Sequence, residues 1–217
     1  MRWVNMTAFI TRCWKKIGFK PGRALAWLVG VAALSASVAW GQTSSVDLTS
    51  LRPSQQNGSL VLHAQLALTL GPAVEDALVK GLAVHFVADA EVLQERWYWT
   101  DKRVGAATRY YRLAFQPLTR RWRLNVSTEP ISSTGLAGSI SQNFDTLAEA
   151  LHVIGRQSSW KIASMQAVQN PSSQRLRYEF KLDVSQLPRP FQIAAGNQAD
   201  WRLQVRQTIS LNLQEEP

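Results

Sequence analysis

The sequence is poor in the residues that usually mark an enzyme or a metalloprotein. Its 217 residues include one cysteine, Cys13, and three histidines. Cys13 precedes an apolar run that we expect to be removed, so the exported chain has no thiol and cysteine catalysis is excluded. A Gly-x-Ser-x-Gly motif, a glycine-rich phosphate loop and a dinucleotide fingerprint are also missing. No motif of established chemistry remains.

The few histidines and carboxylates form no convincing metal-ligand set. The alternation of the sequence places His63 and His85 on the polar faces of two predicted strands. The two histidines would be neighbours if those strands paired. Two histidines without nearby carboxylates are too few ligands for a typical metal site. Asp89 and Glu91, expected in a turn, are better explained as solvated. We therefore predict neither a metal nor a cofactor.

Acidic residues are absent from the first part of the chain. Residues 1–41 hold six bases and no acid, and so carry most of the net charge of +9. Residues 24–39 (ALAWLVGVAALSASVA) are apolar and are followed by the polar GQTSS. A basic segment, a short apolar run and small residues are the parts of a secretory signal peptide. We predict that residues 1–41 are a Sec-type signal peptide, cut ahead of Gln42 or after Ala39, and that the protein is periplasmic.

The alternative for the same segment is an uncleaved anchor. The apolar run of 16 residues is shorter than the roughly 20 that span a bilayer comfortably. If it is retained, the protein would be a scaffold anchored in the inner membrane. Either outcome argues against a nucleic-acid partner, because nucleic acid is not expected in that compartment.

Beyond the leader, strict alternation replaces long apolar runs. Residues 60–70 place five leucines and Ala64 on one side, which is typical of a half-buried strand. We predict strands over 60–70, 82–88, 91–100, 107–116, 119–127, 160–168, 175–183 and 201–213, and short helices over 73–80 and 146–155. One-sided alternation and short connections indicate a mainly β (α+β) fold, an antiparallel β-sandwich or partial barrel of about eight strands with two short helices.

Two polar or proline-rich segments flank this pattern. Residues 42–59 are polar and turn-rich, and we interpret them as a tether. Residues 60–217 then form a single β-rich periplasmic domain. LPRP at 187–190 is expected to be an extended break between two strands rather than a polyproline ligand.

Five ordered blocks resemble a known family. They are EDALVKGLAVHF, ERWYWTDKRV, YRLAFQPLTRRWRL, DTLAEALHVI and LDVSQLPRPFQI. Together they resemble the proteobacterial exported family called domain of unknown function 4390, over roughly residues 60–213. The resemblance implies an envelope protein of a Gram-negative bacterium and, from genes near a nitrogen-type sensor histidine kinase, a link to envelope signalling. It implies no activity and no catalytic residues.

Positive charge is concentrated in one stretch of the exported chain. Residues 96–123 hold eight bases and one acid, Asp101. Strand parity puts the core residues of three predicted strands on one side: Trp97, Trp99, Tyr111, Leu113, Phe115, Trp122, Leu124 and Val126. If the strands form a meander, the opposite side and its rim carry the candidate binding residues: Arg96, Tyr98, Lys102, Arg103, Tyr110, Arg112, Arg121 and Arg123.

Such an arginine–tyrosine face suits an anionic partner. Guanidinium groups bind phosphate or carboxylate through paired hydrogen bonds, and tyrosine adds flat contact area. We therefore predict a non-enzymatic binding domain for an anionic envelope component, either a lipid head group, a cell-wall component or a protein, with possible membrane-surface contact. Two alternatives stay open: an ordinary solvated sheet face, and a periplasmic hydrolase or transferase with a dispersed active site.

Overall fold

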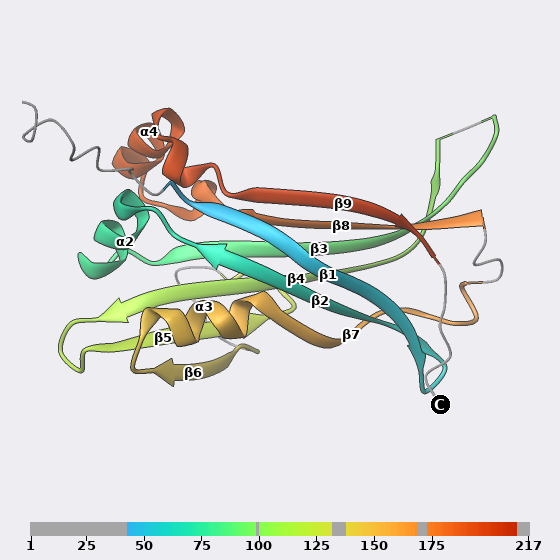
Figure 1. Cartoon of the computed structure of the whole chain (residues 1–217), viewed down its shortest axis with the longest axis horizontal. Helices are drawn as coiled ribbons and strands as arrows, with labels where there is room; N and C mark the ends of the chain where they lie inside the picture. The colour runs from blue at the N-terminus through green and yellow to red at the C-terminus, as the bar shows by residue number, and fades with distance from the viewer. Residues whose placement is uncertain (1–42, 99, 132–137, 169–172, 212–217) are drawn as a thin grey trace, which may run out of the picture. The chain divides into compact units, whose positions relative to one another are not determined.

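Two antiparallel sheets form the fold of this protein (Figure 1). The computed structural model describes residues 43–98, 100–131, 138–168 and 173–211. The smaller sheet has the order β1-β2-β7, and the larger sheet has the order β6-β5-β4-β3-β8-β9. The strands are β1 (Ser45–Gln56), β2 (Ser59–Thr69), β3 (Val84–Gln94), β4 (Lys102–Gln116), β5 (Arg121–Ser127), β6 (Ile140–Phe144), β7 (Arg156–Ser164), β8 (Gln174–Leu182) and β9 (Gln204–Ser210).

Helices connect several of these strands. They are α2 (Pro72–Val79), α3 (Leu147–Gly155) and α4 (Arg189–Asn197), with two short 3-10 turns, η2 (Val184–Gln186) and η3 (Ala199–Trp201). Among the described residues, none of the helices has the length and apolar character needed to cross a membrane.

The smaller sheet and α3 together cover one face of the larger sheet. β7 lies against β3 and β4, β1 lies beside β9, and α3 packs on β5 and β6. The two sheets do not close into a barrel. The predicted fold class, mainly β with antiparallel sheets, is therefore confirmed. The large sheet keeps a second face, its outer face, turned away from the small sheet.

The alternation of the sequence explains which side chains form the core. On β2, Leu60, Leu62 and Ala64 are fully buried, as the period-two pattern predicts. On the facing sheet, the rings of Phe86 and Phe180 stack with their centroids 5.8 Å apart. Burial of these apolar side chains is the main stabilisation of the two-layer arrangement.

One arginine of the basic stretch faces the core instead of solvent. Arg109 has the parity of Tyr111 on β4, and its guanidinium carbon lies 5.0 Å from the ring centroid of the buried Trp160. The hydroxyl of Tyr178 donates to the Gln157 side-chain oxygen nearby, at 3.1 Å. Burial is the largest cause that raises the pKa of both Tyr111 and Tyr178. Arg109 is therefore part of the packing between the sheets.

The predicted tether over residues 42–59 is wrong, because β1 occupies Ser45–Gln56. A register shift between Leu48 and Ser50 interrupts the alternation, so the partly buried apolar positions are Val46, Leu48 and Leu51. Pro53 is tolerated because β1 is an edge strand of its sheet. Because of the bulge and the proline, the sequence of β1 does not show the period-two alternation that predicts a strand.

The predicted strands 82–88 and 91–100 are one strand, β3, which ends at Gln94. The pair Asp89 and Glu91, expected in a turn, lies within this strand. Residues after Gln94 lead into β4, so Trp97 is not a core residue but is 93% exposed. Trp99, also expected in the core, lies outside the described residues.

The remaining differences concern short or irregular elements. The polar edge strand β6 has no apolar alternation and was not predicted. The strand predicted over 160–168 begins earlier, at Arg156. The break predicted over 187–190 is shorter, because α4 begins at Arg189 with Pro190 in its first turn, where a proline is well tolerated.

Candidate functional site

The outer face of the six-stranded sheet collects most of the predicted binding residues, but not in one continuous band. Register fixes their places: His85 faces Arg112 across β3 and β4, and Leu93 faces Arg103. Arg103 and Arg112 are nine residue steps apart on β4, which is about 30 Å along a strand. The eight candidate residues therefore divide into two groups of four at opposite ends of β4.

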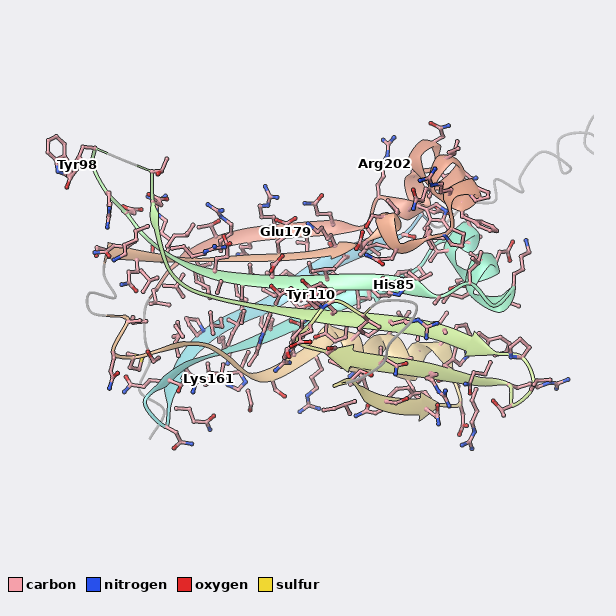
Figure 2. The ribbon with its side chains drawn as sticks, turned by 180° about the vertical axis from the view of Figure 1, so that it is seen from behind. His85, Tyr98, Tyr110, Lys161, Glu179 and Arg202 are labelled. Atoms are coloured by element: carbon pink, nitrogen blue, oxygen red, sulfur yellow. The ribbon has the colours of Figure 1, made fainter. Side chains whose placement is uncertain are left out.

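The first group lies where β3 turns into β4. Arg96, Tyr98 and Lys102 are exposed in or next to this turn, and Tyr98 lies at its far end in Figure 2. The rings of Trp97 and Tyr98 meet edge to face, with centroids 4.9 Å apart. Arg103 is already engaged, because its Nη1 lies 3.2 Å from Glu91 Oε1.

Between the two groups, the outer face carries a cluster of paired charges. Asp89 on β3 faces Glu179 on β8. Glu179 is labelled in Figure 2. Thr108 donates its hydroxyl hydrogen bond to Asp89. Glu179 accepts from Arg206 at 2.6 Å and lies 3.5 Å from Lys181 Nζ.

The basic partners of Glu179 favour its ionised form. Burial alone would raise the pKa of Glu179, but hydrogen bonding and attraction from Arg206, together with Lys181, hold it below its usual range. Glu91 similarly binds both Arg103 and Arg177, at 3.2 and 3.4 Å. A pocket of about 160 Å³ at this cluster is lined by acids and arginines together. The centre of the face is thus internally neutralised.

The second group, which we call the β4–β5 cluster, comprises Tyr110, Arg112, Arg121 and Arg123. Arg112 faces Asn125, and Ala114 faces Arg123, so the two arginines are diagonal neighbours on adjacent strands. Arg121 Nε lies 3.2 Å from Asp145 Oδ1, and Arg123 Nε donates to Asn143 at 3.3 Å. Arg112 forms no ion pair with another residue in the described part of the chain.

A histidine adjoins the β4–β5 cluster. Burial, and then the charge of Arg112, lower the pKa of His85, while Asp183 opposes the shift. The buried Nδ1 of His85 has no hydrogen-bond partner among the described atoms. A cavity of about 20 Å³ between His85, Tyr110, Ile131 and Asp183 has room for about one water molecule.

Comparison with known proteins identifies the family. The family described as Domain of unknown function (DUF4390) matches residues 43–212. The chain belongs to the DUF4390 family. No curated protein matches this chain, and no solved structure matches it either. The match begins close to the start of β1, so this DUF4390 domain includes the segment that was expected to be a tether.

The two histidines that would have been neighbours if their strands paired are far apart in the topology of this DUF4390 domain. His63 lies on β2 and His85 on β3, in different sheets, so the two histidines are not strand neighbours. Within the described ranges, His, Cys, Asp and Glu form no group of three or more that could hold a metal ion.

Two features of this DUF4390 domain were not predicted from its sequence. The paired-charge cluster depends on the register of β3 with β8, which joins residues about ninety positions apart. A groove on the outer side of the small sheet is lined by Arg52 and Arg156, from the supposed tether and from a strand that begins earlier than expected. The only sequence signal for either was the alternation of charged with apolar residues.

Proposed function

We propose that this DUF4390 protein is an exported, non-enzymatic binding domain that contacts an anionic partner of the cell envelope. The basic, acid-free leader followed by an apolar run supports export. The proposal for binding rests on one observation above the others: Arg112, Arg121 and Arg123 lie on adjacent strands on one outer sheet face.

The geometry favours the β4–β5 cluster over the turn between β3 and β4 as the contact surface. Arg112 and Arg123 bind no carboxylate among the described residues, and the single bridge of Arg121 is largely exposed. An exposed bridge contributes only about 0–1 kcal/mol, so an incoming phosphate or carboxylate can replace Asp145. At the turn, by contrast, Arg103 is held by Glu91, and Asp101 adds a negative charge next to Lys102.

A charge-reversal experiment tests the proposal. The wild-type protein and an Arg112→Glu/Arg123→Glu variant are sedimented with phosphatidylcholine vesicles, with and without phosphatidylglycerol, and with purified peptidoglycan. We expect the wild type to bind one anionic material and the variant to lose at least about tenfold in affinity, since two charge-assisted contacts are reversed. Binding should also disappear in about 0.5 M salt, where exposed charges are screened within a few ångström.

The matched control changes the other half of the predicted residues. An Arg96→Glu/Lys102→Glu variant carries the same change in net charge at the turn between β3 and β4. It should bind like the wild type. If both variants lose binding equally, net charge rather than the β4–β5 cluster decides binding. If neither variant loses it, the arginines are ordinary surface and the proposal is wrong.

A further inference from the structure

The outer side of the three-stranded sheet contains a groove that has no counterpart in the predicted binding face. Its volume is about 560 Å³, and residues of β1, β2 and β7 all line it. This is more than three times the volume of the pocket at the paired-charge cluster. It is also within the range of about 300–1,000 Å³ that is usual for small-molecule sites.

Two irregularities in strand pairing create the groove on either side of His63. On β1, the register shifts between Leu48 and Ser50. On β7, Leu62 faces Trp160 but Ala64 faces Gln157, so Ser158 and Ser159 stand opposite His63 alone. Ser159 adopts a positive φ of 50°. Bulges of this kind re-aim side chains and often lie next to functional sites.

The polar lining of the groove is cationic. Arg52 faces His63 across β1 and β2, and Arg156 faces Gln65 across β2 and β7. The two arginines thus flank the central strand, with their Cα atoms on the order of 10 Å apart. The lining contains no carboxylate. Neither arginine forms an ion pair with any residue that the structure describes.

A buried hydroxyl in the same groove lacks a partner. Ser54 is only 9% exposed, and its Oγ has no hydrogen bond to another described atom. An unsatisfied buried polar group costs about 1–3 kcal/mol, so such groups normally have a partner. Ser54 lines the groove together with Arg52 and Ser158. Rotation of the Ser54 side chain about its Cα–Cβ bond would turn the hydroxyl toward the groove, where a ligand oxygen would supply the missing bond.

The donor set selects the class of ligand. The groove offers hydrogen-bond donors from two guanidinium groups, one imidazole and several serine hydroxyls. A single carboxylate has one negative charge and two oxygens, which is too little to pair with all of these donors. A phosphate monoester has a charge near −2 and three acceptor oxygens, which match these donors. The histidine and serines lack a lining carboxylate to complete a catalytic triad.

We infer that the groove between β1, β2 and β7 is a binding site for a phosphate monoester, held by Arg52 and Arg156 with Ser54 as hydrogen-bond donor. The rest of the ligand is small and polar, because Thr49, Ser50, Gln65 and Ser158 are among the remaining residues that line the groove. None of these residues belongs to the β4–β5 cluster, so the inference does not depend on the proposed function.

Titration calorimetry on the purified protein tests this inference with inorganic phosphate, glycerol 3-phosphate and acetate as probes. We expect saturable binding of a phosphate probe and at least tenfold weaker binding of acetate. Arg52→Gln and Arg156→Gln should each weaken binding about tenfold to a hundredfold, the range of one hydrogen bond to a charged group. Ser54→Ala should weaken it about threefold to tenfold, as expected for one ordinary hydrogen bond.

Further variants separate the site from general charge and from folding defects. Lys80→Gln/Arg189→Gln removes two exposed charges that lie outside both the groove and the β4–β5 cluster, and it should leave phosphate binding unchanged. Arg52→Lys retains the charge without the guanidinium fork, and should recover only part of the affinity. Unfolding temperatures without ligand show whether each variant is folded. Should an arginine variant fail to fold, Ser54→Ala and Arg52→Lys still decide the result.

A further comparison in the same experiment distinguishes a phosphate on a lipid head group from a phosphate on a soluble molecule. Vesicles of phosphatidylcholine with phosphatidic acid present the same monoester on a membrane. If the protein binds the phosphatidic acid vesicles strongly and glycerol 3-phosphate weakly, the ligand is a lipid head group. If it binds glycerol 3-phosphate strongly and the vesicles weakly, the ligand is a soluble phosphate monoester. The inference is overturned if neither form binds saturably, if acetate binds as well as phosphate, or if the Arg52 and Arg156 variants bind like the wild type.

Discussion

The outer faces of the two sheets use arginine in opposite ways. At the centre of the six-stranded sheet, Arg103, Arg177 and Arg206 each bind Glu91 or Glu179. On the three-stranded sheet, Arg52 and Arg156 border a groove whose lining has no acid. The inner faces of both sheets contribute to one hydrophobic core, and the two outer faces differ in how their arginines are paired.

This difference separates arginines that support the sheet from arginines that are available to a ligand. A carboxylate on the neighbouring strand neutralises a guanidinium and satisfies its donors within the protein. Where the neighbouring positions are His63 and Gln65, the donors remain free for an external anion. Local pairing, which depends on register, is therefore a better guide to function here than the density of positive charge along the sequence.

Among substitutions on the outer faces of the two sheets, the largest effect on stability should follow from breaking the paired-charge cluster. Glu179→Gln removes the partner of Arg206 and Lys181 from a half-buried position. We expect the free energy of unfolding to fall by about 1–2 kcal/mol, measured by urea denaturation at neutral pH. Arg156→Gln, which breaks no described ion pair, should stay within about 0.5 kcal/mol of the wild type. Equal losses for the two variants would remove the distinction between the faces.

Acidification should destabilise the protein in part through His85. Its folded pKa lies below the ordinary value of 6.5, because of burial and then Arg112. The unfolded chain therefore binds more protons, and stability falls as the pH decreases from about 6.5 towards the folded pKa. The slope from this one group cannot exceed about 1.4 kcal/mol per pH unit. His85→Gln should flatten the curve of unfolding free energy between pH 7 and 5, whereas His63→Gln is the control on the other sheet.

A small stabilisation should follow from removing the unpartnered hydroxyl in the groove. Ser54→Ala eliminates a buried polar atom without a hydrogen bond. We expect the ligand-free protein to gain up to about 1 kcal/mol in unfolding free energy. Thermal denaturation in phosphate-free buffer measures the effect. A loss of stability of similar size would show that Ser54 already has a good partner in the folded protein.

The smallest effect is expected at the turn between β3 and β4. Trp97 is 93% exposed and contacts Tyr98 edge to face. Trp97→Ser should change the unfolding free energy by no more than about 0.5 kcal/mol. The Trp122→Ser variant, which truncates a buried ring, is the contrast and should cost several kcal/mol. A large loss for Trp97→Ser would place its side chain in the core, as the sequence pattern first indicated.

The sequence predicts elements that are regular and buried on one side. β2 and β8 follow strict alternation. Thr146 caps the N-terminus of α3, and its side-chain oxygen accepts a hydrogen bond from the backbone N–H of Glu149, as the capping spacing predicts. The alternation of β1 is interrupted by its bulge, and that of β7 by Ser158 and Ser159, so neither strand could be placed correctly from periodicity.

The site was predictable only in part, for the same reason. Parity placed Tyr110, Arg112, Arg121 and Arg123 on one outer face, as the structure shows. Parity could not show that β3 is a single strand, and so could not show that Arg103 lies about 30 Å from Arg112 along β4. Which charges neutralise one another depends on the pairing of β3 with β8, and no local pattern specifies that pairing.

The most direct test of the distinction between the two faces is a map of amide chemical shifts by nuclear magnetic resonance during titration with inorganic phosphate. We predict saturable shifts at His63, Gln65 and Ser158, with Glu91, Arg177 and Glu179 unchanged. Shifts centred on Glu91 and Glu179, with no response around His63, would contradict the conclusion that paired arginines are structural and unpaired arginines bind the ligand.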